Sequence, residues 1–406
     1  MVAINLAFGA SKRSGFPPLT ALNVVAEANP TAENLALIGR PALADFAMAP
    51  AAPIRGVFQK SGLFDDDAII VCGQAVYRVD TFGIATQIPG SIPGYGRVDM
   101  DGAVNTAGTT SVDEVRVVTG DAIYLVTAAA VAAETFPDSA GVAAVMALRG
   151  YWFAVRADTQ VLYVRVPGDT SWQALSAVSA EKQPDALIGV WPLGDLTVLF
   201  GSASIEAWQF SGTATPPIQP VPGQTFDTFG LLTRDAVASN GSALYFAGSD
   251  FGFYEMTSYP KLISDPSLAE QIRLTDPTTI RVGTITLDQH GYVIVRLGNR
   301  ATWVYDLTTK LWSPWASKGL AYFRGHMFCQ VGGRAIAADS NSATLWIFDP
   351  DGLSDDGDEI VRQFTGIMPI SGGSARIATV GLDLEVGVGM ESGQGSDQQR
   401  GMHICT

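Results

Sequence analysis

Basic residues are scarce in this chain, and so are charged residues of any kind. Lysine and arginine number 25 against 40 aspartates and glutamates, so the 406-residue chain carries a formal net charge of −15. Proteins that hold the DNA backbone neutralise phosphates with lysine and arginine, and this balance therefore disfavours tight binding of nucleic acid. The low share of Glu, Lys and Arg also disfavours a coiled coil.

Cysteines and long apolar runs are few as well. Cys72, Cys329 and Cys405 lie far apart, which matches neither a disulfide framework nor the spacing of a zinc site, and a reducing intracellular site of assembly fits best. The longest uncharged apolar run, residues 122–133, is shorter than the roughly 20 residues that span a bilayer. The N-terminus has no basic start before a hydrophobic stretch, so we expect no signal peptide and no membrane segment.

Turn-forming residues are abundant instead. The chain has 43 glycines and 22 prolines, and 47% of its residues are hydrophobic, which argues against disorder. A long chain with low charge and abundant glycine favours many short buried strands joined by tight turns.

A hairpin pattern recurs seven times along the chain. Each copy has a short apolar strand, a polar or glycine turn, and a second strand that carries an aromatic residue. The aromatic markers are Tyr77, Tyr124, Tyr163, Trp208, Tyr254, Tyr305 and Trp346. Their mean spacing of about 45 residues is close to the repeat of four-stranded propeller blades, so each hairpin is expected to supply the two middle strands of a blade.

The strands are near-continuous apolar runs, which is typical of sheets covered on both faces. The sequence therefore predicts an all-β fold, a β-propeller of six or seven blades with an extended N-terminal arm and a short C-terminal β extension. A large β-sandwich or barrel is the alternative. The 39-residue interval between Tyr124 and Tyr163 is a candidate for a degenerate blade, and the Ala-rich residues 127–148 for a long loop or a short helix.

Three parts of the chain are predicted. Residues 1–56 are rich in alanine and proline and are assigned to an extended N-terminal arm with the first propeller strands. Residues 57–351 are assigned to the β-propeller. Residues 352–406 begin with an acidic loop and are assigned to a C-terminal β domain.

Motifs that carry chemistry are not found in the sequence. No nucleophile elbow and no phosphate-binding loop occurs. His326 and Cys329 form a lone pair that lacks the further ligands of a zinc site, so both are interpreted as strand residues in a blade. We therefore predict no catalytic residues, no cofactor and no metal site.

Two acidic segments and the tryptophans also have structural interpretations. Residues 349–359 fail the spacing of a calcium loop and are interpreted as a solvated acidic turn. Residues 65–67 are interpreted as a turn at a blade edge. The eight tryptophans occur roughly once per blade, which favours packing between blades over a sugar-binding surface.

The central part of the chain carries a resemblance to a known family. Residues 182–190 read KQPDALIGV, and residues 194–206 read GDLTVLFGSASIE. This run resembles the pattern QPD-x-h-h-G … D-h-h-h-h-F-G-x-x-S-h-E (h, apolar) of packaged-DNA stabilisation proteins, the tail hub or head-closure proteins of short-tailed bacteriophages. Further segments agree in order: GRVDM at 96–100, LRGYWF at 148–153, VYD at 304–306, LDLEV at 382–386 and, more weakly, LNVVAE at 22–27.

The resemblance covers about residues 20–396 and implies a structural virion protein rather than an enzyme. Such proteins form a ring, here expected to be a homohexamer, below the portal and its adaptor ring. The ring completes the head after genome packaging, retains the DNA, and carries the tail needle or distal tail and fibre parts. Family members continue into a longer C-terminal β domain that residues 400–406 do not match, so that domain is predicted to be curtailed.

From this resemblance we expect the protein in the virion tail, after assembly in the host cytoplasm. Phe8, Phe16 and Pro17 are the predicted contacts to a neighbouring subunit or the adaptor, because extended arms bind by strand addition. The acidic balance predicts that DNA meets the protein only sterically. A propeller lectin or glycan-acting enzyme is the alternative function, and a cellular scaffold is a third.

Overall fold

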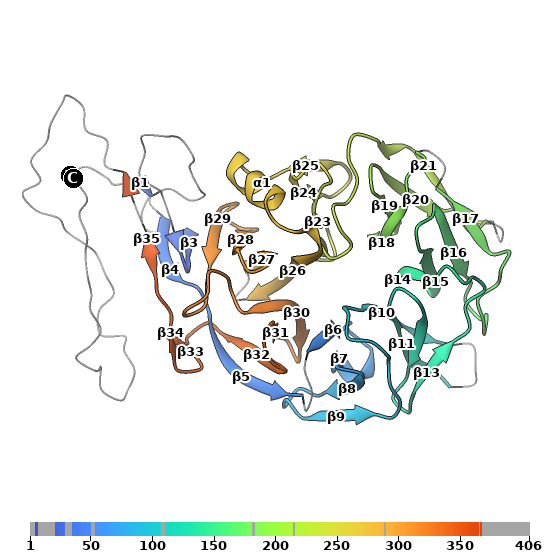
Figure 1. The fold of residues 1–406 in the computed structure, drawn as a ribbon, viewed down its shortest axis with the longest axis horizontal. Coiled ribbons are helices and arrows are strands. Elements are labelled where there is room, and N and C mark those ends of the chain that lie inside the picture. The colour runs from blue at the N-terminus through green and yellow to red at the C-terminus, as the bar shows by residue number, and fades with distance from the viewer. Residues whose placement is uncertain are drawn as a thin grey trace, which may run out of the picture.

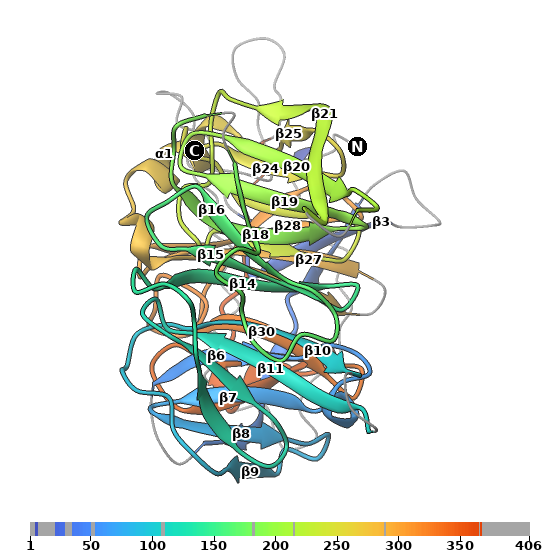
Figure 2. The same ribbon diagram turned by 90° about the vertical axis from the view of Figure 1, so that its right-hand side faces the viewer.

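The repeated hairpins lie in seven four-stranded antiparallel sheets that form a ring. The computed structural model describes residues 5–6, 21–28, 35–49, 53–106, 110–180, 183–213, 216–287, 290–364 and 366–367. Figure 1 shows the ring face-on, with the first strand of each sheet toward the centre, and Figure 2 shows it from the side. The predicted all-β propeller is confirmed, and it has seven blades.

The first four blades follow one another along the chain. Blade 1 contains β6 (Ile54–Phe58), β7 (Ala68–Cys72), β8 (Ala75–Val79) and β9 (Ala85–Ile88). Blade 2 contains β10 (Asp99–Asn105), β11 (Val112–Val118), β12 (Ile123–Val126) and β13 (Val131–Glu134). Blade 3 contains β14 (Val142–Leu148), β15 (Tyr151–Arg156), β16 (Val161–Arg165) and β17 (Ala177–Ser179). Blade 4 contains β18 (Leu187–Leu193), β19 (Leu196–Gly201), β20 (Ile205–Phe210) and β21 (Ile218–Phe226).

The remaining blades complete the ring. Blade 5 contains β22 (Val237–Ser239), β23 (Leu244–Ala247), β24 (Phe253–Met256) and β25 (Pro260–Leu262). Blade 6 contains β26 (Ile280–Leu287), β27 (His290–Leu297), β28 (Ala301–Asp306) and β29 (Trp312–Trp315). Blade 7 contains β30 (Gly325–Val331), β31 (Arg334–Asp339), β32 (Thr344–Asp349) and, from the N-terminal side, β5 (Ala42–Met48).

The hydrophobic core is divided among the gaps between neighbouring blades. Seven clusters of buried apolar side chains fill these gaps, one for each pair of neighbours. Strand β7 shows why the sequence pattern is continuous: Ala68 and Ile70 enter the cluster shared with blade 7, whereas Ile69 and Val71 enter the cluster shared with blade 2. Because both faces of a blade are covered, successive residues along the strand are all apolar.

Each marker aromatic lies on the third strand of its blade, as the hairpin interpretation predicts. Each one packs in the cluster between its own blade and the preceding blade. Tyr305, for example, joins the cluster of blades 5 and 6, and Trp346 joins that of blades 6 and 7. The period read from the sequence is therefore the period of interblade packing.

The expectation of a loop or helix over residues 127–148 is wrong, as is that of a degenerate blade near it. Strand β13 is the outer strand of blade 2, and β14 is the first strand of blade 3. Alanine favours helices, but pairing within a sheet and burial override that preference here. The described residues contain one α-helix, α1 (Pro266–Arg273), and two 3₁₀ turns, η1 (Phe64–Asp66) and η2 (Pro277–Thr279). No described helix is long and apolar enough to cross a membrane.

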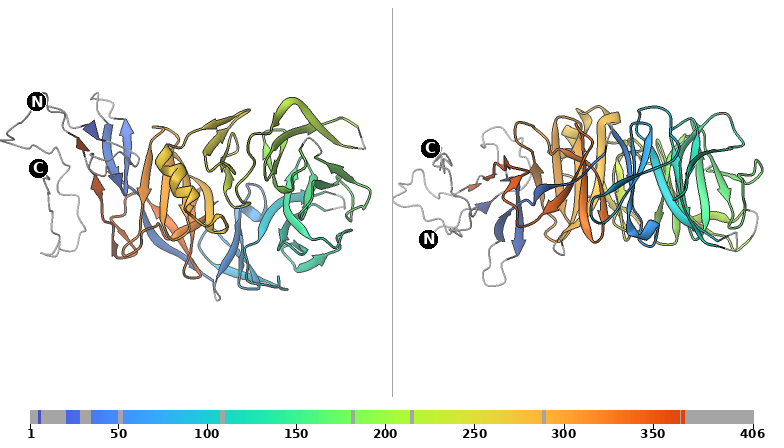
Figure 3. Two further views of the ribbon diagram at one scale, coloured as in Figure 1. Left: turned by 45° about the horizontal axis from the view of Figure 1, so that its top comes forward. Right: turned by 90° about the horizontal axis from the view of Figure 1, so that it is seen from below.

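Short strands outside the blades form a small β unit at the rim of the disc, beside β29 and β5 (Figures 1 and 3). Its strands come from both sides of the propeller in sequence. They are β1 (Asn5–Leu6), β2 (Ala21–Leu22), β3 (Val24–Ala28), β4 (Leu35–Gly39), β33 (Ser354–Asp355), β34 (Asp358–Glu359), β35 (Gln363–Phe364) and β36 (Gly366–Ile367). The pairs are β1 with β36, β2 with β35, β3 with β4 and β33 with β34. The boundaries set at residues 56 and 351 stay a prediction.

Three buried tyrosines predict an alkaline limit to stability. Burial, with Glu255 and Asp306 nearby, raises the pKa of Tyr305 to about 12, and burial raises the pKa of Tyr245 and Tyr254 as well. Unfolded, each phenol ionises near its ordinary pKa of 10.0. As pH rises, these phenols lose their protons in the unfolded chain before they do in the folded chain. We therefore expect full stability below pH 10.0 and a decline in the free energy of unfolding as pH rises toward 12. Tyrosinate absorbance should rise together with unfolding. Ionisation of these phenols near pH 10.0 in an intact fold would contradict this.

Candidate functional site: the closure junction

The ring is closed by hydrogen bonds between strands from the two ends of the propeller. Strand β5 pairs antiparallel with β32, from Ala42 opposite Asp349 to Met48 opposite Thr344. Strand β6 of blade 1 follows β5 directly along the chain, so this one sheet joins the first and last blades. Because β5 completes blade 7 and leads directly into blade 1, the two ends of the propeller are tied together in one sheet.

A buried ion pair fixes the start of the closing strand. The Arg40 and Asp355 side chains are 0% and 2% exposed, and they form a bidentate ion pair. Arg40 Nη1 donates to Asp355 Oδ1 at 3.0 Å, and Nη2 donates to Oδ2 at 2.5 Å. The backbone N–H of Leu43 also donates to Asp355 Oδ1, at 3.1 Å. We call these three residues, together with Asn23, the closure junction.

Asn23 connects the junction to the small β unit and to blade 6. Its Oδ1 accepts from Arg40 Nε at 3.0 Å and from the Ala316 N–H at 2.8 Å. Its Nδ2 donates to the Val361 carbonyl at 2.8 Å. Asn23 has a φ of 56°, a left-handed conformation that asparagine tolerates better than most residues. Three regions far apart in sequence, residues 23–40, Ala316 and residues 355–361, therefore meet at this point.

The interpretation of residues 349–359 as a solvated acidic turn is wrong for Asp355. Asp356, Asp358 and Glu359 are exposed, but Asp355 is 1% exposed. The reason is Arg40, which lies 315 residues earlier and supplies the compensating charge.

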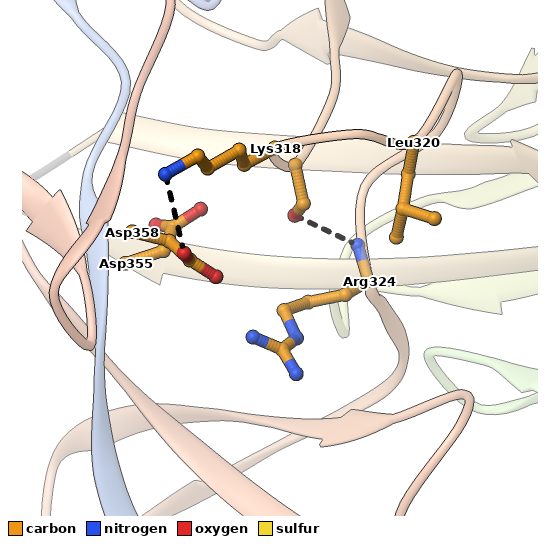
Figure 4. Close-up of a pocket in the computed structure, with 6 residues that line it drawn as sticks. Lys318, Leu320, Arg324, Asp355 and Asp358 are labelled. Carbon is orange, nitrogen blue, oxygen red and sulfur yellow. Dashed lines mark hydrogen bonds and ion pairs between the residues drawn. The ribbon is translucent and has the colours of Figure 1, made fainter.

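A polar pocket of about 160 Å³ lies next to the junction (Figure 4). Lys318 Nζ lies 3.6 Å from Asp358 Oδ1, and the Arg324 N–H donates to Ser317 Oγ at 3.2 Å. The Arg324 guanidinium pairs with Asp339 at 2.7 Å. The charged side chains that line this pocket are thus paired within the chain.

Asp339 shows how firmly the charges beside this pocket are held. Burial alone would raise its pKa, but hydrogen bonds from Asn341 and Trp346 and the charge of Arg324 outweigh it, so the pKa is lowered. Among the residues that the structure describes, no group of three His, Cys, Asp or Glu side chains could hold a metal ion.

The residues singled out in the sequence have these positions. Phe8, Phe16 and Pro17 lie outside the described residues. His326 and Cys329 both lie on β30, as expected of strand residues in a blade. Seven of the eight tryptophans are buried, which confirms the packing interpretation. The turn at residues 65–67 precedes β7, where Asp65 and Asp67 both pair with Arg78.

The central motif of the resemblance forms a brace in blade 4. Asp185 Oδ2 accepts from the backbone N–H groups of Ala203 and Ser204, at 2.7 and 3.0 Å, and Oδ1 accepts from Ser204 Oγ at 2.9 Å. A Cβ on Gly201 would lie 2.1 Å from Asp185 Oδ2, so only glycine fits there. The aspartate, glycine and serine of the motif thus act together to hold the turn between β19 and β20.

No signal in the sequence points to the closure junction itself. Arg40 and Asp355 belong to segments with no shared motif, and only the closed ring brings them together. Asn23 lies in the weakest segment of the resemblance, residues 22–27, which assigned it no role.

These features define a closed seven-bladed β-propeller. The family model described as "Bacteriophage P22 Gp10, beta-propeller" matches residues 3–352, and the chain belongs to this family. It is therefore a phage structural protein of the virion, and the family resemblance seen in the sequence is confirmed.

Solved structures support the fold alone. BBS1N in complex with ARL6DN is similar with a TM-score of 0.50 and 10% identity, over 78% of this chain and 99% of that chain. The extracellular domain of the putative hybrid two-component system BT4673 from B. thetaiotaomicron is similar with a TM-score of 0.50 and 6% identity, over 76% of this chain and 40% of that chain. The comparison with curated proteins gives no match.

Proposed function

We propose that this chain is a tail hub, or head-closure, protein that acts as a homohexamer below the portal and its adaptor ring. The hexamer closes the DNA exit channel, retains packaged DNA by steric blockage, and carries the tail needle or distal tail and fibre parts. The observation that carries the proposal is the family match over residues 3–352. The function is mechanical and needs no catalytic group.

The build of the propeller supports a mechanical role. Interblade clusters and the β5–β32 pairing make each blade depend on its neighbours, so a load on one blade is shared by the ring. The β unit at the rim offers a two-stranded sheet, β3 with β4, in which β3 lies against β29 and β4 has no further strand partner among the described residues, so the edge of β4 can accept a strand from a neighbouring subunit or from the adaptor. We assign the subunit contacts to this unit and to the arm with Phe8, Phe16 and Pro17.

The net charge of −15 supports retention without adhesion. DNA and an acidic surface repel each other, so the strand can leave the channel once it opens. The lectin alternative receives no comparable support, because nearly all the tryptophans that would form a sugar platform are buried.

The oligomeric state and place in the particle test the proposal. We expect electron microscopy of the purified 42.8 kDa chain, alone or with portal and adaptor, to show six-fold rings, and mass spectrometry to find the chain in virions. Duplex DNA should not bind at physiological ionic strength. A monomer that is absent from particles, or tight DNA binding by the isolated protein, would refute it. Cleavage of a host polysaccharide would favour the alternative.

A further inference from the structure

A cavity of about 230 Å³ lies in the middle of the ring, apart from the closure junction. Residues of β6, β10, β22, β26 and β30 line it, so five blades contribute to its wall. Its charged and titratable lining residues are Arg97, Asp99 and His326. We call this space the channel cavity.

Three arginines gather around the carboxylate of Asp235, and Arg97 is the one of them that lines the channel cavity. Arg97 Nε lies 3.0 Å from Asp235 Oδ1, Arg281 Nη1 lies 3.1 Å from Oδ2, and Arg234 Nε lies 3.6 Å from Oδ1. Arg234 and Arg281 also donate to backbone carbonyls. With Asp99 nearby, two carboxylates therefore face three guanidinium groups.

Arg97 is the least satisfied of the three. Its side chain is 27% exposed, yet Nε is buried and, although it lies 3.0 Å from Asp235 Oδ1, it makes no hydrogen bond of good geometry within the described part of the chain. Burial lowers the pKa of Arg97 to about 10, and the charges of Arg281 and Arg234 add to this effect. Guanidinium groups normally retain their charge, and a buried one is costly unless acceptors surround it.

The other titratable groups of the cavity offset this excess of positive charge only in part. Asp99 Oδ2 already accepts from the Val145 N–H at 2.9 Å, and burial raises the pKa of this carboxyl. His326 Nδ1 lies 3.0 Å from the Ala338 carbonyl, and burial, helped by nearby arginines such as Arg296, lowers its pKa to about 4. The histidine is thus neutral at pH 7. A positive excess remains at the centre of an otherwise acidic protein.

We propose that the channel cavity binds a small oxyanion of the phosphate class, held by Arg97 with Arg281 and Arg234 beside it. The planar fork of arginine matches phosphate oxygens, and charge-assisted hydrogen bonds are strong where water is excluded. A space of 230 Å³ accommodates a free oxyanion with some water, but no nucleic-acid duplex. The inference stands independently of the proposed place in the tail.

Titration of the intact chain with inorganic phosphate tests the site. We expect phosphate, but not chloride at equal ionic strength, to raise the unfolding temperature, and calorimetry to give one site per chain. Arg97→Gln and Arg281→Gln should each weaken phosphate binding about tenfold or more. The matched control is Arg273→Gln on α1, where the side chain is 59% exposed, and it should leave the affinity unchanged.

Asp235→Asn separates an anion site from a purely structural cluster, because the two predict opposite responses to phosphate. If an anion binds, removing the competing carboxylate strengthens phosphate binding and phosphate restores the unfolding temperature of the variant. If water alone satisfies Arg97, the variant is destabilised and phosphate does not rescue it. No phosphate binding by either the natural chain or Asp235→Asn overturns the proposal, even if Arg97→Gln fails to fold.

Discussion

Replacing Asp355 with alanine is expected to lower the free energy of unfolding by about 3–5 kcal/mol, because the Arg40 guanidinium is then buried without its carboxylate. Asp355 accepts hydrogen bonds from Nη1 and Nη2 of Arg40 and from the backbone N–H of Leu43, so one substitution removes three hydrogen bonds. The loss falls at the start of β5, the strand that closes the ring. Urea unfolding followed by circular dichroism measures the effect.

Two variants control for this prediction. Asp195→Ala breaks an ion pair with Arg149 whose side chains are 71% and 52% exposed, and it should change stability little. The double variant Arg40→Met with Asp355→Leu removes both buried charges and should recover part of the loss. A cost for Asp355→Ala no larger than that for Asp195→Ala would show that the junction does not hold the ring.

The blades could be predicted because their cause is local in sequence. A strand with both faces covered must be apolar throughout, as β7 is, and the aromatic on the third strand repeats because each interblade gap needs one. The prediction of a loop or a short helix over the Ala-rich residues 127–148 was wrong because helix propensity is a weak preference. Strand pairing within the sheets of blades 2 and 3 determines the structure of this segment.

The sites could not be predicted because they exist only in the closed ring. Arg40 and Asp355 lie 315 residues apart, and neither stands in a pattern that points to the other. Arg97 and Arg281 lie close to different innermost strands and meet only where blades converge. Arg97 stands in the GRVDM segment of the family resemblance, which marked the position without revealing its charge partner.

Removing residues 1–49 is expected to prevent the chain from folding as a monodisperse propeller. The deletion takes away β5 and Arg40, so β32 becomes an open edge and Asp355 loses its buried partner. Ala47 and Ala49 also leave the cluster between blades 7 and 1, which exposes apolar side chains such as Leu345. An unpaired strand edge beside exposed apolar surface promotes association, so aggregates or a broad unfolding transition should be seen by light scattering and circular dichroism.

Removing only residues 1–20 separates closure of the ring from contact with partners. This deletion keeps β2, β5 and the whole closure junction, so the propeller should still fold and unfold in one cooperative transition. It removes Phe8, Phe16 and Pro17, the predicted contacts to a neighbouring subunit or adaptor, so six-fold rings should be lost. If rings persist in this variant, the subunit contact lies on the propeller or on the β unit at the rim.

A normal, cooperative monomer after removal of residues 1–49 would mean that β5 is dispensable for closing the propeller.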